Sequence, residues 1–501
     1  MKKIVYLPLD ERPCNYSFCQ FVVQDNNEIK LVCPPLTILG NKKQPANHDE
    51  IVRFLTEQCV DADYLIIAVD MLLYGGLVPS RLHEMSVDEV SSRAKLLQKL
   101  KQNNPRLRTY AFSLVMRCPT YSSSDEEPDY YEQYGERIFN YGVNEHKFSD
   151  GLVDEQTYLY QKQLLNVPKN VIEDYTKRRK VNLSVLKEVL KFVGGAIDEF
   201  VILQDDSNPY GFTAMDQRVV KQVLTDNDIQ VDIHPGGDEG GLTLLARVLA
   251  KIKGHSPKIC PVFPKPECMS VVPLFEDRAV YKSICSQIQS AGCTVATEDD
   301  AEIYLFCNLP VGQMKDVLQQ NDEHCDASYN DRGLTSFVSK LAKLHVSGKA
   351  VAIADIAYAN GGDVEFARMV SDKVGLLNTA GYAGWNTSSN TLGTVICQTV
   401  FYCFYGNTPT HKRFTAERVY EDIAYCSYAR MYITTNLLPE RGMNYFNVVE
   451  ARGFAASNAK KISEQFVAKY LPEISAKYVI DDCFMPWKRM FEVGFTVKEK
   501  N

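Results

Sequence analysis

Short apolar runs alternate with longer amphipathic segments along most of the chain. The runs that predict buried strands cover residues 3–9, 64–70, 109–116, 200–203, 302–308, 350–355 and 375–379, with another beginning at Ile229. Helical spacing fills the intervals, for example over 47–58, 86–102, 155–195 and 392–405. Strands that alternate with helices are typical of parallel βαβ units, so the pattern predicts an α/β protein.

Eight such strands are the number that closes a barrel. We therefore predict a TIM-like (β/α)8 barrel over residues 1–409, with a loop insertion after the third strand near 118–155. Residues 410–501 read as a mainly helical C-terminal extension. An open, doubly wound sheet is the alternative, but the first strand turn has no G-x-G-x-x-G and gives a dinucleotide site no support.

Polar side chains follow most of these strands. Because right-handed crossovers would bring all strand ends to one face, we expect a shared rim there. Its expected members are Asp10, Asp70, Arg117, Asp205, Asp206, Asp238, Asn308, Asp355, Trp385 and Asn386.

Composition narrows the class of partner. The net charge of −8 over 501 residues gives no general attraction to nucleic acid or anionic lipid. The N-terminus is too short in apolar length for a signal peptide, and the longest apolar segment, 64–78, is too short to span a bilayer. The cysteines sit singly in apolar runs, as small buried side chains in a reducing compartment do. We expect a cytoplasmic protein with a small-molecule substrate, no membrane or nucleic-acid partner, and possible homo-oligomers.

The rim is rich in carboxylates, amides and aromatic residues and poor in His. The sequence has no Ser nucleophile elbow, no P-loop and no His-x-His pair, so we predict neither a metal nor a cofactor. Carboxylates for acid/base work, beside a Trp platform and side chains that bind hydroxyls, indicate a carbohydrate substrate. Trp385 is the expected platform and Tyr74 the expected donor to an acetamido carbonyl; Asn386, Asp355 and Asp10 are expected hydroxyl ligands, and Arg12 is a further candidate.

Asp205 and Asp206 are adjacent at one strand end, within Gln204-Asp-Asp-Ser-Asn-Pro-Tyr-Gly211. Ordinary glycosidases use two separated carboxylates, about 5–5.5 Å apart for retention and about 6.5–9.5 Å for inversion. An adjacent pair suits substrate-assisted hydrolysis, in which the acetamido oxygen of the sugar attacks the anomeric carbon. Two such close acids raise the pKa of one of them, as a general acid near neutral pH requires.

Five blocks resemble a bacterial family catalogued as domain of unknown function 4127. They are Tyr6-Leu-Pro-Leu-Asp-Glu-Arg-Pro13, Asp70-Met-Leu-Leu-Tyr-Gly-Gly-Leu77, Gln204-Asp-Asp-Ser-Asn-Pro-Tyr-Gly211, Pro235-Gly-Gly-Asp-Glu239 and Gly384-Trp-Asn-Thr-Ser-Ser-Asn-Thr-Leu-Gly393. Separately, the pair Asp205-Asp206 is similar to the adjacent acids of substrate-assisted β-N-acetylhexosaminidases, which are retaining barrel enzymes. That similarity implies that Asp205 polarises the acetamido group and that Asp206 is the general acid/base.

Two other classes of function stay open. A metal-dependent hydrolase or phosphoesterase would use Asp10, Asp70, Asp205, His234 and Asp238 as oxygen-rich ligands. A carbohydrate-binding or regulatory barrel without catalysis is the third interpretation. The bland alternatives are that an Asp of the pair caps a helix or pairs with an Arg, and that Trp385 belongs to the core. The run Arg178-Arg179-Lys180 predicts a solvated helix face.

Overall fold

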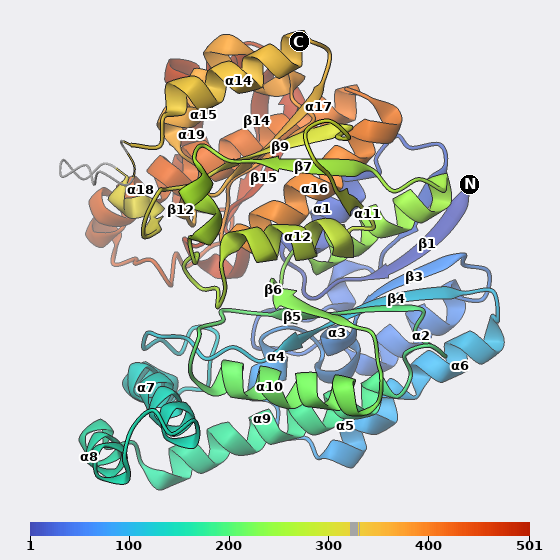
Figure 1. Ribbon diagram of the computed structural model, residues 1–501, viewed down its shortest axis with the longest axis vertical. Helices are drawn as coiled ribbons and strands as arrows, with labels where there is room; N and C mark the ends of the chain where they lie inside the picture. The colour runs from blue at the N-terminus through green and yellow to red at the C-terminus, as the bar shows by residue number, and fades with distance from the viewer. Residues whose placement is uncertain (321–328, 330, 501) are drawn as a thin grey trace. The chain divides into compact units, whose positions relative to one another are not determined.

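The computed structural model describes residues 1–320, 329 and 331–500 (Figure 1). The chain divides into two compact units. Unit 1 comprises Met1–Glu11, Asn26–Gly241 and Phe275–Asp277, and unit 2 comprises Arg12–Asp25, Leu242–Leu274 and Arg278–Asn501. The boundary expected at residue 409 falls inside unit 2.

Unit 1 is built on a six-stranded parallel sheet in the order β2-β1-β3-β4-β5-β6. The strands are short and almost wholly apolar, because a parallel sheet is covered on both faces. All of their carboxyl ends therefore lie at one edge of the sheet. The strands are β1 (Lys2–Leu7), β2 (Ile29–Val32), β3 (Tyr64–Ala68), β4 (Arg108–Val115), β5 (Glu199–Gln204) and β6 (Asp232–Pro235).

The helices of unit 1 begin where side-chain caps are available. The side chains of Asn47 and Ser86 accept hydrogen bonds from the N–H groups of Glu50 and Glu89, so both expected helix starts are confirmed. The helices are α2 (His48–Gln58), α3 (Val69–Tyr74), α4 (Pro79–Leu82), α5 (Val87–Ala94), α6 (Leu96–Asn103), α7 (Tyr131–Ser149), α8 (Glu155–Leu165), α9 (Lys169–Leu190) and α10 (Phe212–Asp226), with a 3-10 turn η1 (Leu36–Ile38).

A small apolar cluster joins α7, α9 and α10 to the chain beyond β4 (Figure 1). It contains Tyr131, Tyr175 and Phe212, which pack against Met116 and Cys118. The cluster anchors residues 116–131, the segment that leaves the end of β4 and passes along the edge where the strands end.

Unit 2 contains a second parallel sheet, in the order β13-β11-β9-β7-β8. Its strands are β7 (Lys258–Val262), β8 (Thr294–Val295), β9 (Ile303–Asn308), β11 (Ala350–Asp355) and β13 (Gly381–Ala383). The remaining short strands and 3-10 turns are β10 (Lys315–Asp316), β12 (Tyr358–Ala359), η2 (Pro266–Ser270), η3 (Val317–Gln319) and η4 (Leu376–Asn378).

The helices of unit 2 include most of the C-terminal region. They are α1 (Pro13–Val22), α11 (Gly240–Lys253, whose first two residues belong to unit 1), α12 (Val280–Ser290), α14 (Leu334–Val346), α15 (Val364–Lys373), α16 (Ser388–Tyr405), α17 (Pro409–Arg418), the π-helix η5 (Val419–Ala429), α18 (Arg430–Asn436), α19 (Phe454–Tyr470) and α20 (Pro472–Ser475). An antiparallel pair, β14 (Tyr478–Phe484) and β15 (Gly494–Glu499), follows, and η6 (Pro439–Arg441) and η7 (Pro486–Lys488) are 3-10 turns.

The prediction of an α/β fold with parallel sheets is confirmed. The strands pair in two sheets, of six and five strands, and closure into an eight-stranded barrel stays a prediction. The strand expected at 375–379 is wrong in position: Gly375 has φ +80° and precedes the 3-10 turn η4, and the strand begins at Gly381. Strand β7 was not predicted, because Pro261 interrupts its apolar run.

Two composition-based expectations concern the described residues alone. Their cysteines are all free, and most are buried. Among the helices described, none combines the length and apolar character that a membrane crossing needs.

Candidate functional site

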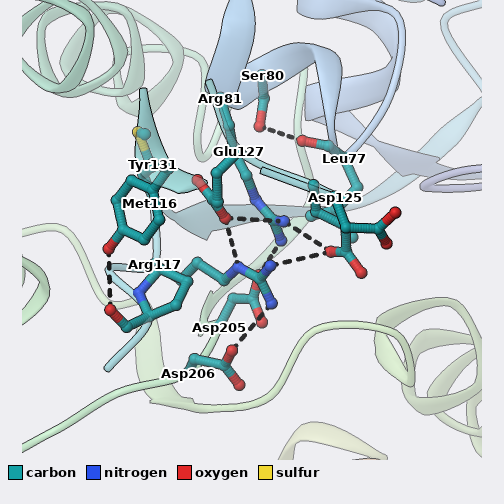
Figure 2. A network of polar contacts seen from close by, with 12 residues as sticks. Leu77, Ser80, Arg81, Met116, Arg117, Asp125, Glu127, Tyr131, Asp205 and Asp206 are labelled. Carbon is teal, nitrogen blue, oxygen red and sulfur yellow. Dashed lines mark hydrogen bonds and ion pairs between the residues drawn. The ribbon is translucent and has the colours of Figure 1, made fainter. Parts of the chain in front are cut away.

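Two buried arginines of unit 1, Arg81 and Arg117, form the centre of a charged cluster at the edge where the strands end (Figure 2). Arg81 lies on the single-turn helix α4, which begins with Pro79, a residue suited to a first helical position. The hydroxyl of Ser80 donates to the carbonyl of Leu77 at 2.6 Å and fixes the turn that presents Arg81.

Arg117 follows β4, and the backbone around it is held from α9. The guanidinium of Arg179 donates to the carbonyls of Met116 (2.7 Å) and Arg117 (2.8 Å), and the Tyr175 hydroxyl donates to the latter carbonyl at 3.1 Å. Arg179 also pairs with Asp216. Arg179 is 2% exposed, so the expected solvated face at 178–180 is wrong: this Arg is an internal support of the site.

Two adjacent glutamates of the segment after β4 bind both arginines. Glu127 is buried, and its Oε1 accepts from Arg117 Nε at 2.8 Å and from Arg81 Nη1 at 3.4 Å. Oε2 of Glu126 accepts from Arg81 Nη1 at 2.8 Å and from Arg117 Nη2 at 3.1 Å. The insertion after β4 thus supplies half of the carboxylates of the cluster.

Asp205 and Asp206 supply the other two carboxylates. Arg81 Nη2 donates to Asp205 Oδ2 at 2.5 Å, and Arg117 Nη1 donates to Asp206 Oδ2 at 2.9 Å (Figure 2). Asp206 has φ +36°, in the left-handed region that residues other than Gly seldom occupy. This turn directly after β5 directs the two neighbouring acids to two different arginines.

The charges in the cluster do not balance. Two guanidinium groups face four carboxylates, 2 − 4 = −2 if all are ionised. Burial raises the pKa of Asp206 to about 7, and the charge of Asp205 adds to the rise, while Arg117 and Arg81 act against it. Asp206 therefore exchanges a proton near neutral pH.

The aspartates reach solvent. The side chain of Asp205 is 20% exposed and that of Asp206 is 15% exposed, although the arginines that bind them are almost fully buried. Tyr121 lies near Arg117 and is 46% exposed. The Arg117 charge lowers the pKa of Tyr121, but burial and the charge of Asp206 raise it to about 12, so the hydroxyl stays protonated.

The chain around Asp205 and Asp206 is held by further polar contacts. Gln204 Nε2 donates to Asp277 at 2.9 Å, and Gln217 Nε2 donates to the same oxygen at 3.0 Å. The N–H of Ser207 donates to the carbonyl of Phe275 at 2.8 Å. The segment 275–277 is thus part of unit 1 because it supports the end of β5.

The structure brings several expected residues of unit 1 to the same sheet edge. Asp70 follows β3 and is buried; its Oδ2 accepts from the Ser113 hydroxyl at 2.9 Å and from the N–H of Leu114 at 3.0 Å. Burial raises the pKa of Asp70 to about 6, against these two hydrogen bonds. Tyr74 is buried and stacks on His83 with ring centroids 4.6 Å apart. Both side chains serve packing within unit 1.

Asp10 and Asp238 are buried beyond β1 and β6. His234, on β6, is fully buried, and its Nδ1 lies 2.9 Å from the carbonyl of Pro235. Within the part of the chain that the structure describes, no three or more His, Cys, Asp or Glu side chains form a group with metal-binding geometry.

The other expected residues belong to unit 2. Asn308 Nδ2 donates to Asp355 Oδ1 at 2.9 Å and to Asp363 Oδ2 at 3.2 Å, and Arg332 Nη1 donates to Asn308 Oδ1 at 3.0 Å. The Tyr382 hydroxyl donates to Asp355 Oδ2 at 2.9 Å. All five side chains are buried, so they form an internal polar network at the ends of β9, β11 and β13.

Trp385, Asn386 and Arg12 also lie in unit 2. The indole N–H of Trp385 donates to Thr394 at 3.1 Å, its ring meets that of Phe18 edge-on at 6.0 Å, and the residue is 5% exposed. Asn386 has φ +50°, and its carbonyl accepts from the N–H of Asn360 at 2.7 Å. Arg12 Nη1 lies 3.6 Å from Glu492. Here Trp385 is a core residue rather than an exposed sugar platform.

The sequence did not single out Arg81, Glu126, Glu127 or Tyr121 as site residues. Arg81 closes the block that follows β3, and the other three lie in the polar insertion after β4. The available signal was position, since both segments directly follow strands that flank β5 or its neighbour.

The fold and this cluster define an α/β protein with two parallel sheets and a solvent-reaching group of carboxylates and arginines beyond one of them. The chain belongs to the family described as protein of unknown function (DUF4127), whose model matches residues 4–496. The expected family membership is therefore confirmed. Neither the comparison with curated proteins nor that with solved structures gives a match.

Proposed function

We propose that the cluster around Arg81 and Arg117 is the catalytic centre of a retaining glycoside hydrolase for 2-acetamido sugars. Asp206 is the general acid/base, and Asp205 orients the acetamido group. The observation that carries this proposal is the state of Asp206: it reaches solvent at a strand end, and its pKa of about 7 lets it donate and accept a proton near neutral pH.

Asp205 suits the second role because Arg81 stabilises its negative charge. A charged carboxylate accepts a hydrogen bond from the acetamido N–H and makes the acetamido oxygen a better nucleophile. Its Oδ1 lies next to Gly237, where an added Cβ would come within 3.9 Å. A residue without a side chain at this position leaves room beside the carboxylate.

The reaction then has two balanced steps. The acetamido oxygen forms a bond to the anomeric carbon while the bond to the leaving oxygen breaks and Asp206 gives that oxygen its proton. In the second step Asp206 takes a proton from water, the water oxygen bonds to the anomeric carbon, and the cyclic intermediate reopens. Two displacements at one carbon retain its configuration.

The proposal uses the ends of the unit 1 strands and needs no closed eight-stranded barrel. Tyr121 replaces Trp385 as the aromatic side chain beside the sugar, because it is exposed next to Arg117 and Asp206. The free, mostly buried cysteines fit a reducing compartment, and we place the activity in the cytoplasm.

The test is a panel of aryl glycosides with and without a 2-acetamido group. We expect cleavage only of acetamido sugars, with kcat falling as the pH rises above about 7, because the general acid must be protonated to act. Replacement of the acetamido group by trifluoroacetamido lowers the rate, since the attacking oxygen becomes less nucleophilic. If plain glycosides are cleaved equally well, substrate assistance is excluded, and if none is cleaved, the glycosidase proposal fails.

Asp198 provides the matched control. Its side chain is also 15% exposed and pairs with Arg108, but it precedes β5 at the opposite edge of the same sheet. We expect Asp198→Asn to keep full activity per folded molecule. Asp206→Asn activity recovers with a dinitrophenyl leaving group, which needs no proton, whereas Asp205→Asn activity does not.

A further inference from the structure

A second candidate binding site lies in unit 2, in a groove between α19 and the helices η5 and α18. The groove has a volume of about 380 Å³, which falls within the range of small-ligand pockets, roughly 300–1,000 Å³. It shares no residue with the cluster around Arg81 and Arg117.

Four aromatic rings form a continuous row along the groove. Tyr432 stacks on Tyr428 with centroids 5.9 Å apart, Tyr428 contacts Phe466 at 5.2 Å, and Phe466 contacts Tyr470 at 4.7 Å. Tyr428 and Tyr432 are 41% and 43% exposed. Exposed neighbouring rings that lie nearly parallel, here 20° apart, present a flat apolar surface with polar hydroxyl edges.

The polar side chains of the groove are cationic or neutral. Lys461 and Lys469 line it together with the amides of Asn458 and Gln465. None of the lining residues, all of them in the described part of the chain, carries a carboxylate. A local excess of two positive charges in a chain of net charge −8 favours an anionic ligand.

We propose that this groove binds an acidic saccharide. The apolar faces of sugar rings lie on the row of aromatic rings, the sugar carboxylates pair with the two lysines, and the amides bind hydroxyls. The Asn458 Nδ2 donates to the carbonyl of Phe454 at 2.9 Å, which fixes the amide and leaves its oxygen as an acceptor for a hydroxyl donor. A row of rings longer than one base favours successive sugar units over a single nucleotide.

The proposal does not depend on the catalytic one, because binding in this groove needs no cleavage. Asp206→Asn must therefore bind saccharide as the natural protein does. This separates the two: loss of catalysis leaves the groove occupied, and loss of the groove leaves hydrolysis of short aryl glycosides unchanged.

The test measures calorimetric binding of the full chain to an α-linked galacturonate trimer, its methyl-esterified form, N-acetylneuraminic acid and AMP. We expect at least one acidic saccharide to bind, and the uncharged ester about tenfold more weakly. Added salt weakens binding of the acid and leaves that of the ester unchanged.

The double variants Tyr428→Ala/Tyr432→Ala and Lys461→Gln/Lys469→Gln each lower the affinity by about tenfold or more. Their matched controls are Tyr160→Ala, which removes another exposed tyrosine, and Lys343→Gln/Lys349→Gln, which removes two exposed lysines elsewhere. The proposal is overturned if neither acidic saccharide binds at low-millimolar concentration, if AMP alone binds, or if both groove variants bind normally.

Discussion

Both units place carboxylates beyond the ends of parallel strands, but in different surroundings. In unit 1, Asp205 and Asp206 pair with buried arginines while their side chains remain 20% and 15% exposed. In unit 2, Asp355 and Asp363 are 1% and 2% exposed and are enclosed by the partners described above. Burial raises the pKa of Asp355 to about 7, with the charge of Asp363 adding to the rise.

The comparison shows that a raised pKa alone does not mark a catalytic acid. Asp206 and Asp355 have the same pKa and the same principal cause, which is burial. They differ in access to solvent and in the use of their oxygens. Asp355 accepts hydrogen bonds at both oxygens from protein donors, so it stabilises the ends of three strands, whereas Asp206 can meet a substrate.

The largest expected effect separates these two aspartates by activity. Asp206→Asn should lower kcat/KM for the best acetamido glycoside by about 100- to 10,000-fold, because it removes the general acid. Asp355→Asn should leave kcat/KM per folded molecule unchanged and lower stability instead. Steady-state kinetics with active-site titration measure both, and equal losses of activity would contradict the distinction.

The second prediction compares buried arginines. Arg418 is fully buried and binds Glu421 and Asp422. Arg418→Gln should cost about 3–5 kcal/mol of unfolding free energy, since it leaves buried carboxylates without a cation. Arg81→Gln should cost less, because Asp205 and Glu126 retain access to water. Urea unfolding of both variants tests this order, and a larger loss for Arg81→Gln reverses it.

The third prediction concerns pH. Glu417 is buried in unit 2, its Oε2 has no hydrogen-bond partner, and burial raises its pKa from 4.5 to about 8. The folded state holds this proton above the pH at which the unfolded state loses it, so stability falls as the pH rises from about 4.5 to about 8.

Glu417→Gln should remove this dependence. Between about pH 5 and about pH 8, the natural protein should lose about 2–4 kcal/mol more than the variant, at about 1.4 kcal/mol per pKa unit. Unfolding free energies measured across this range decide it. Parallel pH profiles for the two proteins would show that Glu417 does not carry the effect.

The smallest effect distinguishes two tyrosines. Tyr382→Phe removes a buried hydrogen bond to Asp355 and should cost about 1–2 kcal/mol of stability. Tyr121→Phe should change stability by less than about 0.5 kcal/mol, because the side chain is exposed. Thermal unfolding measures both, and a loss for Tyr121→Phe as large as that for Tyr382→Phe would place Tyr121 among the structural residues.

Local sequence was sufficient for most elements and for half of the candidate site. Apolar runs predicted the strands that end at Ala68, Val115 and Gln204, and Asn47 and Ser86 predicted helix starts. The pair Asp205-Asp206 and Arg117 stood out because they directly follow strands. These features depend on residues next to one another in the chain, so a single sequence reveals them.

The sequence could not give the partners of those residues. Arg81 meets Asp205 across 124 positions, and Glu127 bridges Arg81 and Arg117, through contacts that no local pattern encodes. Arg179 looked like part of a solvated run, yet it binds the backbone beyond β4. Trp385 stood between polar neighbours, yet its ring is internal.

By itself, the sequence determined that this protein alternates strands with helices and carries an adjacent pair of acids at a strand end. Only the tertiary structure decided which strands pair in each sheet and which strand ends meet. It also decided that Asp205 and Asp206 reach solvent while Asp355 does not. The physical reason is that strand order and burial arise from long-range packing, and burial sets whether a carboxylate supports the fold or meets a substrate.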